Sequence, residues 1–269
     1  TVTSIFTPLI GGHEIRIYKE PIDGFVLFDI LQENKVTVLK LTPAHLALLH
    51  EQCFENSSLQ TLIVGGENLK VSIAQTVYER FQRNISIFNE YGPTEATVGC
   101  MIHKYDPKTD IGHSVPIGKP ADNVQLYVLD EHQQILPMGS IGELYIAGDG
   151  VAKGYWCRDD LTKSHFIEDH FLPCKTLYKT GDLVRFNENG LLEYVGRKNH
   201  QVKINGYRIE LEEIEARLLA LSTITHAFVS AWEMPDGRKQ LSAYIVSTED
   251  MDPSVIKAGL SSSLPAYMV

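Results

Sequence analysis

The sequence lacks a cluster of Lys and Arg residues, a long apolar run and any Cys-x-x-Cys pair. Its 24 basic residues are outnumbered by 34 acidic ones, and without a basic stripe nucleic-acid binding has no basis. No apolar run is long enough to span a bilayer and no signal peptide is visible, so no membrane contact is expected. The four cysteines are scattered, which favours reduced thiols in the cytoplasm over a disulfide framework or a zinc site.

The composition is that of a globular enzyme. The chain has 269 residues, of which 43% are hydrophobic and 22% are charged, enough for one large domain and one small one. With a net charge of −10, binding of a highly anionic ligand would need positive charge gathered locally, with a metal ion helping. The chain starts at Thr1 without a methionine and stops abruptly after Leu264-Pro265-Ala266-Tyr267-Met268-Val269, so both ends are expected to be cut.

The first half predicts an α/β layer. Short apolar runs alternate with amphipathic segments, and Thr42 before Pro43 is typical of a helix cap. Such alternation implies right-handed crossovers and a mostly parallel sheet. The expected strands are 36–41, 62–64 and 85–88, and the expected helices are 44–52 and 71–82.

Polar residues stand where these strands end. Lys40, Gly65 and Asn89-Glu90 close the three predicted strands, and ligands of parallel sheets bind at the carboxyl ends of the strands. These residues should therefore share a crevice. Lys40 and Glu90 are charged at positions otherwise expected to be buried, where a charge is costly unless it is paired or used.

The second half predicts two further patterns. From about Val115, strands separated by Gly and Asn turns indicate an antiparallel sheet or distorted β-barrel beside the α/β layer. After Gly206, a helix and two strands that flank Pro235-Asp236-Gly237-Arg238 indicate a small α+β module. The expected domains are 1–199 and 200–269; the expected strands are 125–129, 143–147, 191–195, 202–204, 226–233 and 240–246, and the helix is 211–221.

The segment from Asn89 to Thr97 has two interpretations. As local structure, Gly-Pro-Thr-Glu is an ordinary strand-to-helix turn that Thr94 can cap, and the spacing alone favours this interpretation. As a functional turn, the Thr94 hydroxyl and nearby N–H groups would meet a phosphate and Glu95 would hold a metal ion, while Tyr91 would stack on a purine.

A second segment runs from Tyr178 to Leu183. Asp182 after a glycine is usually a turn residue, but a carboxylate in this setting also suits two ribose hydroxyls. Arg197 is either part of a surface ion pair or a bidentate contact to phosphate or ribose.

Taken together, these segments resemble the acyl-adenylate-forming superfamily, and specifically the amino-acid-activating adenylation domains of nonribosomal peptide synthetases. The likeness covers essentially the whole chain, and the order of its motifs makes it specific. The motifs are Tyr91-Gly92-Pro93-Thr94-Glu95, Gly142-Glu143-Leu144-Tyr145-Ile146-Ala147-Gly148 with Ala152-Lys153-Gly154-Tyr155, Tyr178-Lys179-Thr180-Gly181-Asp182-Leu183, Gly196-Arg197-Lys198-Asn199-His200-Gln201-Val202-Lys203-Ile204 and Leu264-Pro265-Ala266-Tyr267-Met268.

The resemblance implies a two-step reaction. The carboxylate of an amino acid attacks the α-phosphate of MgATP, and the aminoacyl group then passes to the phosphopantetheine thiol of a peptidyl carrier protein, beside neighbouring synthetase modules. A small C-terminal subdomain rotates between the steps. By position, Tyr91 would stack on adenine, Asn89 would hydrogen-bond the adenine edge, and Gly65 and Gly66 would line the nucleotide site. Thr94 would contact phosphate, Glu95 would bind Mg2+, and Asp182 would hold the ribose with help from Arg197. Lys203 and Gly206 would take part in thiolation.

The sequence departs from the family pattern in three places. The phosphate-binding loop with its lysine should lie upstream of Thr1, and the catalytic lysine should lie beyond Val269. Asn199 stands where the hinge aspartate is usual. A chain of this span alone is therefore expected to adenylate poorly or not at all.

The resemblance also implies an amino-acid pocket lined by Thr3, Lys40, Ile63, Gly65, Glu90, Val98 and Gly99. A lysine beside a glutamate suits a carboxamide, whose oxygen accepts from Lys40 and whose NH2 donates to Glu90. Asparagine is the predicted substrate, and the set also resembles the family's pattern for that amino acid. Aspartate is second because Glu90 would repel it, and glutamine would need a deeper pocket.

Two other functions remain open from the sequence. An aryl- or fatty-acyl-CoA ligase would share the fold and the nucleotide motifs, but it has no need of a charged pair in its acyl pocket. A catalytically incomplete binding fragment is the alternative from another class. The lysines expected upstream of Thr1 and beyond Val269 would decide between this fragment and an enzyme.

Overall fold

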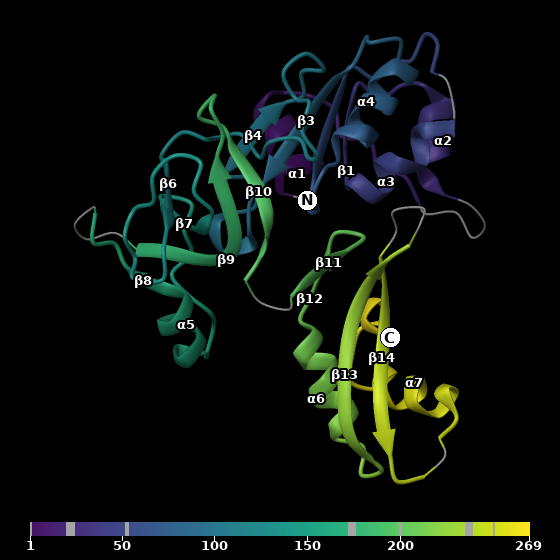
Figure 1. The fold of residues 1–269 in the computed structure, drawn as a ribbon. Helices are drawn as coiled ribbons and strands as arrows, with labels where there is room; N and C mark the ends of the chain where they lie inside the picture. The colour runs from purple at the N-terminus through teal and green to yellow at the C-terminus, as the bar shows by residue number, and fades with distance from the viewer. Residues whose placement is uncertain are drawn as a thin grey trace. The chain divides into compact units, whose positions relative to one another are not determined.

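The computed structural model describes residues 2–19, 25–51, 54–171, 176–198, 201–234, 239–249 and 251–269. The chain divides into two compact units, Thr1–Lys198 and Asn199–Val269, and Figure 1 shows their elements. The boundary expected from the sequence, between residues 199 and 200, lies one residue further along. The expected hinge residue Asn199 and the Pro235–Arg238 turn lie outside the described residues.

The first sheet of the larger unit has the strand order β1-β2-β3-β4-β5. Its first three strands pair in parallel, and β4 and β5 add antiparallel. Only a short loop joins β3 to β4, and such a loop cannot make the crossover that a parallel partner needs. The strands are β1 (Val38–Leu41), β2 (Thr61–Gly65), β3 (Ser86–Tyr91), β4 (Met101–Lys104) and β5 (Lys119–Pro120).

Helices α3 and α4 pack side by side against one face of this sheet (Figure 1). That face includes Leu62, Val64 and Ile87, which are almost completely buried in the same apolar cluster as the helices. Thr42 caps α3 as expected, because its hydroxyl oxygen accepts the His45 N–H. The helices of this unit are α1 (Val2–Ile10), α2 (Val26–Glu33), α3 (Pro43–Ala47), α4 (Val71–Arg80) and α5 (Asp159–His165), with 3-10 turns at Leu48–Glu51 and Thr94–Ala96.

The second sheet is antiparallel, as the sequence predicts. Its strand order is β10-β9-β7-β6, and β8 pairs with β9, so the described strands form an open ladder. An isolated bridge between Gly118 and Leu192 joins this sheet to the end of the first one. The strands are β6 (Val124–Leu129), β7 (Gly142–Gly148), β8 (Phe166–Glu168), β9 (Thr176–Phe186) and β10 (Leu192–Arg197).

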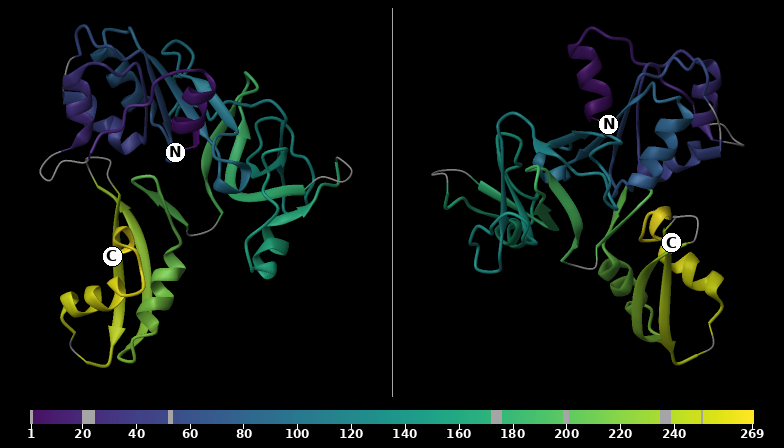
Figure 2. Two further views of the ribbon diagram at one scale, coloured as in Figure 1. Left: turned by 180° about the vertical axis from the view of Figure 1, so that it is seen from behind. Right: turned by 45° about the horizontal axis from the view of Figure 1, so that its top comes forward.

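The smaller unit is an α+β module. A long hairpin of β13 (Ile224–Glu233) and β14 (Lys239–Ser247) shares one apolar cluster with α6 (Leu211–Leu219) and α7 (Pro253–Ser261), and Figure 2 shows these four elements from two further sides. A second hairpin pairs β11 (Val202–Ile204) with β12 (Tyr207–Ile209). Its two turn residues, Asn205 and Gly206, both have positive φ, as a two-residue hairpin turn of this type requires. A 3-10 turn at Ala266–Met268 follows.

Among the described residues, no helix combines the length and the apolar character needed to cross a membrane.

Candidate active site

The turn after β3 is tightly folded. A Cβ atom on Gly92 would lie 1.5 Å from the carbonyl oxygen of Val98, so only glycine fits there. The Pro93 carbonyl accepts the N–H groups of Ala96 and Val98. Thr97 and Val98 follow with φ angles of 57° and 69°, a left-handed conformation that β-branched residues rarely adopt. Backbone strain of this kind clusters at functional sites, and here it stands where the sequence predicts a phosphate-binding turn.

Thr94 and Glu95 occupy different environments in this turn. Thr94 is exposed, so its hydroxyl is accessible to a ligand, whereas Glu95 is 7% exposed. The Glu95 carboxylate accepts the hydroxyl hydrogen of Tyr155 at 2.6 Å, and its backbone carbonyl accepts the Ala152 N–H at 2.8 Å. The Ala152–Tyr155 motif therefore holds Glu95 in place. Mg2+ commonly uses one or two protein carboxylates and completes its shell with phosphate and water, so a single carboxylate beside Thr94 fits this ion.

Tyr91, Asp182 and Arg197 form one buried cluster. The Tyr91 hydroxyl donates to Asp182 Oδ2, and Arg197 Nη1 lies 3.2 Å from Asp182 Oδ1. Burial, followed by the charge of Asp182, raises the pKa of Tyr91 well above its ordinary range, so the phenol remains a hydrogen donor. The structure thus brings together three of the four residues predicted for adenine and ribose, although Tyr91 lies far from Asp182 and Arg197 in sequence.

Asn89 is buried and has hydrogen-bond partners within the protein. Its side chain is 2% exposed, and its NH2 group donates to the carbonyl oxygens of Val115 and Pro116, both at 3.0 Å. Asn89 thereby fixes the segment at 115–116. An amide also has an oxygen that can accept from the adenine amino group, so the predicted hydrogen bond to the adenine edge stays a prediction. Gly65 ends β2, and Gly66 follows it with a positive φ of 92°.

Four of the predicted pocket residues share one face of the first sheet. Lys40 is the register partner of Ile63, and Gly65 is the partner of Glu90. Since paired residues point to the same side and side chains alternate along a strand, all four lie on the face opposite Leu62 and Val64. The helix pair α3 and α4 covers the other face.

Thr3, Lys40 and Glu90 are joined by hydrogen bonds on that face. Lys40 Nζ donates to Glu90 Oε2 and, at 3.0 Å, to the Thr3 hydroxyl, which in turn donates to Glu90 Oε1 at 3.1 Å. The Lys40 and Glu90 side chains are 19% and 11% exposed. A Cβ on Gly99 would lie 2.6 Å from Glu90 Oε1, so the absence of a side chain at Gly99 makes room for this carboxylate. Val98 immediately precedes Gly99 and is half-buried.

Lys203 belongs to the smaller unit. It lies in β11, is half-buried and is the register partner of Arg208. The predicted role in thiolation stays a prediction.

Two residues that hydrogen-bond parts of the predicted site had no role assigned from the sequence. Tyr155 is the partner of Glu95, and Glu143, only 4% exposed, accepts the Gly181 N–H beside Asp182. Both stand in motifs that the sequence had singled out, but their partners lie 60 and 38 residues away.

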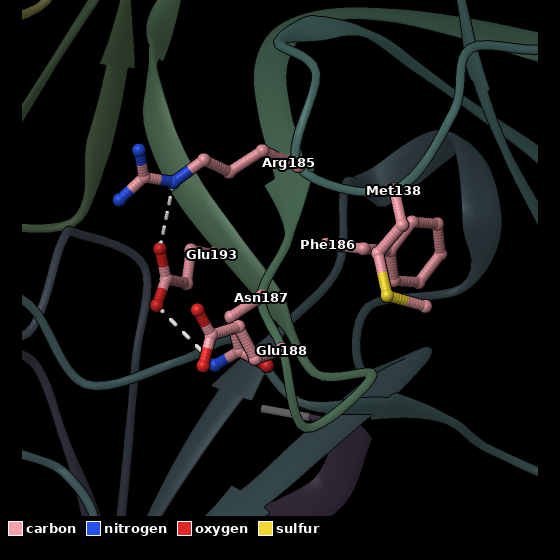
Figure 3. Close-up of a pocket in the computed structure, with 7 residues that line it drawn as sticks. Met138, Arg185, Phe186, Asn187, Glu188 and Glu193 are labelled. Atoms are coloured by element: carbon pink, nitrogen blue, oxygen red, sulfur yellow. Dashed lines mark hydrogen bonds and ion pairs between the residues drawn. The ribbon is translucent and has the colours of Figure 1, made fainter.

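A surface groove of about 600 Å3 lies elsewhere on the larger unit, along β9 and β10. None of the predicted site residues lines it. Figure 3 shows the ion pair there between Arg185 and Glu193, with a nitrogen to oxygen distance of 2.9 Å, and the hydrogen bond that Asn187 gives to the same carboxylate. The groove is lined by Met138, Gly139, Arg185, Phe186, Asn187, Glu188 and Glu193.

The arrangement of these elements is that of an adenylate-forming enzyme fold. It matches the solved structure of an artificially fused adenylation–PCP di-domain from Klebsiella oxytoca, with a TM-score of 0.84 and 26% identity, over 99% of this chain and 50% of that one. A family model described as AMP-binding enzyme matches residues 1–156, and the chain belongs to this family.

Curated relatives share much of the sequence. Over 100% of its length the chain is 51% identical to bacitracin synthase 3 of Bacillus licheniformis and 49% identical to tyrocidine synthase 3 of Brevibacillus parabrevis. It spans 4% of the length of each of these relatives.

Proposed function

We propose that this chain activates asparagine with ATP, giving an asparaginyl-adenylate for transfer to the phosphopantetheine thiol of a carrier protein in nonribosomal peptide synthesis. The observation on which the substrate depends is the cluster of Thr3, Lys40 and Glu90 beside Gly65 and Gly99. A cytoplasmic location belongs to the same proposal, since ATP is available there and thiols stay reduced.

The cluster is balanced in charge, and this favours a neutral ligand. A carboxamide entering between Lys40 and Glu90 accepts from the ammonium and donates to the carboxylate, so both charges keep a hydrogen-bonded partner. The Thr3 hydroxyl, which already bridges the two, adds a third polar contact. The carboxylate of aspartate would satisfy Lys40 but would face Glu90 with a like charge in a partly buried site, where such repulsion is weakly screened.

Size is the ground on which the proposal prefers asparagine to glutamine. Gly65 and Gly99 carry no side chains next to Glu90, and a Cβ on either would lie 2.6 Å from a Glu90 oxygen. Glutamine is longer than asparagine by one methylene and would need a deeper pocket.

The nucleotide would meet the other cluster. In this proposal the adenine stacks on the Tyr91 ring, and the ribose hydroxyls compete for the Asp182 carboxylate, whose position Arg197 fixes from 3.2 Å. Thr94 and the strained turn that follows it would hold phosphate oxygens through hydroxyl and N–H groups. When bound at Glu95, Mg2+ would neutralise charge on the phosphates. The chain's own contribution is to orient the reactants and to stabilise developing charge.

Transfer to a carrier protein is supported by the solved di-domain of similar fold, whose description names a PCP domain. Lys203, on the β11–β12 hairpin of the smaller unit, is the residue of this chain that we assign to that step. Neighbouring synthetase modules are the expected context, because the chain matches a small part of long peptide synthases.

An exchange of pyrophosphate into ATP, measured with the full-length protein and each of the twenty amino acids, tests the substrate. Asparagine should exceed aspartate and glutamine in kcat/KM by at least about tenfold, because a site built from buried polar partners rejects ligands that leave them unpaired. Equal or reversed rates for aspartate would refute asparagine. Exchange with aryl or fatty acids but with no amino acid would favour the acyl-CoA ligase alternative.

A variant sharpens the same test. Glu90→His replaces a like charge with a hydrogen-bond donor and should move preference towards aspartate. Glu131→His is the matched control, because Glu131 is a glutamate whose side chain is 80% exposed and remote from the cluster in sequence. It should leave the ratio of the two rates as in the unmodified protein.

A further inference from the structure

The strand that holds Asp182 contains a bulge at that point. In the β7–β9 ladder Glu143 pairs with Leu183 and Tyr145 pairs with Lys179. Between these pairs β7 has one residue, Leu144, whereas β9 has three. The extra residues cannot all find partners in the ladder, and a bulge of this kind re-aims a side chain. Here Gly181 adopts a φ of 74°, and the residue that the bulge re-aims is Asp182.

Side chains supply the partners that the ladder cannot. Glu143 Oε1 accepts the Gly181 N–H at 3.2 Å, and the Lys198 N–H donates to the Gly181 carbonyl at 2.9 Å. Arg197 Nη2 donates to the Thr180 carbonyl at 3.0 Å. Asp182 itself donates its N–H to the Thr180 hydroxyl oxygen, also at 3.0 Å. The backbone that leads into Asp182 is thus held by contacts from β7 and from the end of β10.

Glu143 closes a ring of three contacts in this arrangement. Its Oε1 accepts from Gly181, the Gly181 carbonyl accepts from Lys198, and Lys198 Nζ lies 3.4 Å from Glu143 Oε2. The Glu143 side chain is 5% exposed and that of Lys198 is 54% exposed. Burying a carboxylate costs free energy, and a neutral acceptor would satisfy the Gly181 N–H equally well. The negative charge of Glu143 therefore serves to fix Lys198, the last residue of the larger unit.

We propose that Glu143 is a positioning residue for the nucleotide: it holds the Gly181 bulge, and through it the Asp182 carboxylate, in the orientation that meets the ribose. This inference rests on the proposed function, because it takes Asp182 as the ribose contact. Glu143 does not touch the nucleotide in this account. Its effect should appear in the affinity for ATP and AMP and not in the affinity for the amino acid, which binds at Lys40 and Glu90.

The test compares Glu143→Ala, Glu143→Gln and Glu193→Gln in the full-length protein. Glu193 is the matched control, because it is a half-buried glutamate of β10 that pairs with Arg185 of β9 at 2.9 Å, outside the bulge (Figure 3). The KM values for ATP and for asparagine are measured separately by pyrophosphate exchange, AMP affinity is measured by calorimetry, and a thermal melt reports folding.

Glu143→Ala should raise the KM for ATP and the Kd for AMP about tenfold, the effect of about 1.4 kcal/mol that leaving one buried N–H without its acceptor produces. The KM for asparagine should stay within about twofold of the unmodified value. Glu143→Gln keeps an acceptor oxygen but loses the charge that fixes Lys198, so it should recover most of the loss, to about threefold. Glu193→Gln should change none of these values.

A merely structural role predicts a different pattern. A folded Glu143→Ala variant that lowers the melting temperature but leaves ATP and AMP binding unchanged would overturn the inference, as would an equal loss for ATP and asparagine. If Glu143→Ala does not fold, Glu143→Gln decides: weaker AMP binding than in Glu193→Gln supports the inference, and equal binding overturns it. If the unmodified protein exchanges with no amino acid, the proposed function fails, and the AMP titration still tests the role of Glu143 by itself.

Discussion

Gly99→Ala is a small change that should disturb the amino-acid cluster without removing any of its polar atoms. The new methyl group would lie 2.6 Å from Glu90 Oε1 and 2.7 Å from its Cδ, closer than real contacts allow. The φ angle of Gly99 is outside the left-handed region, and the residue is exposed, so the backbone accepts alanine there. The Glu90 carboxylate, as the end of a flexible side chain, has to move.

The size of that movement sets the expected effect. For the new methyl group and Glu90 Oε1 to reach an ordinary contact distance of about 3.4 Å, the carboxylate has to shift by about 0.8 Å. A shift of that size stretches the Thr3 hydroxyl bond to Glu90, now 3.1 Å, to as much as about 3.9 Å, which is no longer a hydrogen bond. Hydrogen bonds to charged groups contribute about 1.5–3 kcal/mol, so kcat/KM for asparagine should fall by about 10- to 100-fold.

The assay is pyrophosphate exchange with asparagine, together with a thermal melt. Gly112→Ala is the control, because its added Cβ would find Ser114 O at 3.9 Å and nothing nearer, so it should leave kcat/KM unchanged. Glu90→Asp in the Gly99→Ala background shortens the acid by one methylene and should restore part of the loss. The reasoning is refuted if Gly99→Ala keeps asparagine activity within twofold, or if Gly112→Ala loses as much.

Three further changes test other parts of the structure. Gly92→Ala places a Cβ 1.5 Å from the backbone oxygen of Val98, which cannot move away. The variant should therefore be less stable by about 3 kcal/mol or more. Its denaturant midpoint should be lower than that of an alanine variant at a glycine with open space around it. Burial, with the charge of Asp182 adding to it, raises the pKa of Tyr194 from 10.0 to about 12. A folded pKa above the unfolded one gives a stability that is fully present below pH 10 and is lost between pH 10 and 12. In denaturant titrations a Tyr194→Phe variant should therefore lose less stability over this pH range, and its remaining loss comes from other buried phenols such as Tyr145. Burial likewise raises the pKa of the Cys100 thiol to about 12. Iodoacetamide at pH 8 should therefore label the exposed Cys157 and leave Cys100 unlabelled. Equal labelling of the two thiols would contradict the burial of Cys100.

The strands and helices of the first sheet were predictable because their patterns are local. The strands expected at 62–64 and 85–88 are short apolar runs and form the buried centre of the sheet. The first is longer by one residue at each end, and the second begins one residue later and ends three residues later than expected. The helix expected at 44–52 becomes the short α3 followed by a 3-10 turn, so its cap at Thr42 was predictable and its length was not. Helix α1 was missed although Val2, Ile5, Phe6 and Leu9 recur at helical spacing, because Pro8 inside it is a signal against a helix.

Strand β9 shows why a functional motif can hide a structural element. Gly181-Asp182 is typical of a turn, yet both residues lie inside an 11-residue strand. The bulge reconciles the two, because it gives a turn-like conformation to residues that stay within the ladder. Its support comes from Glu143 and Lys198, and contacts over such separations follow from the fold and not from any local pattern. The same holds for Thr3 and Glu90, which are 87 residues apart.

Strand β3 contributes to both proposed sites, with the amino-acid contact on one face and the adenine contact on the other. Side chains alternate along a strand, so Glu90 points to the face that it shares with Lys40, while Asn89 and Tyr91 point to the opposite face. Neighbouring residues are about 3.3 Å apart along the strand, which places the proposed amino-acid contact and the proposed adenine contact within one peptide unit of each other. A slip of one residue in the pairing of β3 with β2 would exchange the two faces and bury Glu90 in the apolar cluster. The cost of that burial fixes the register, and the register therefore sets which residue faces the amino acid and which faces the nucleotide.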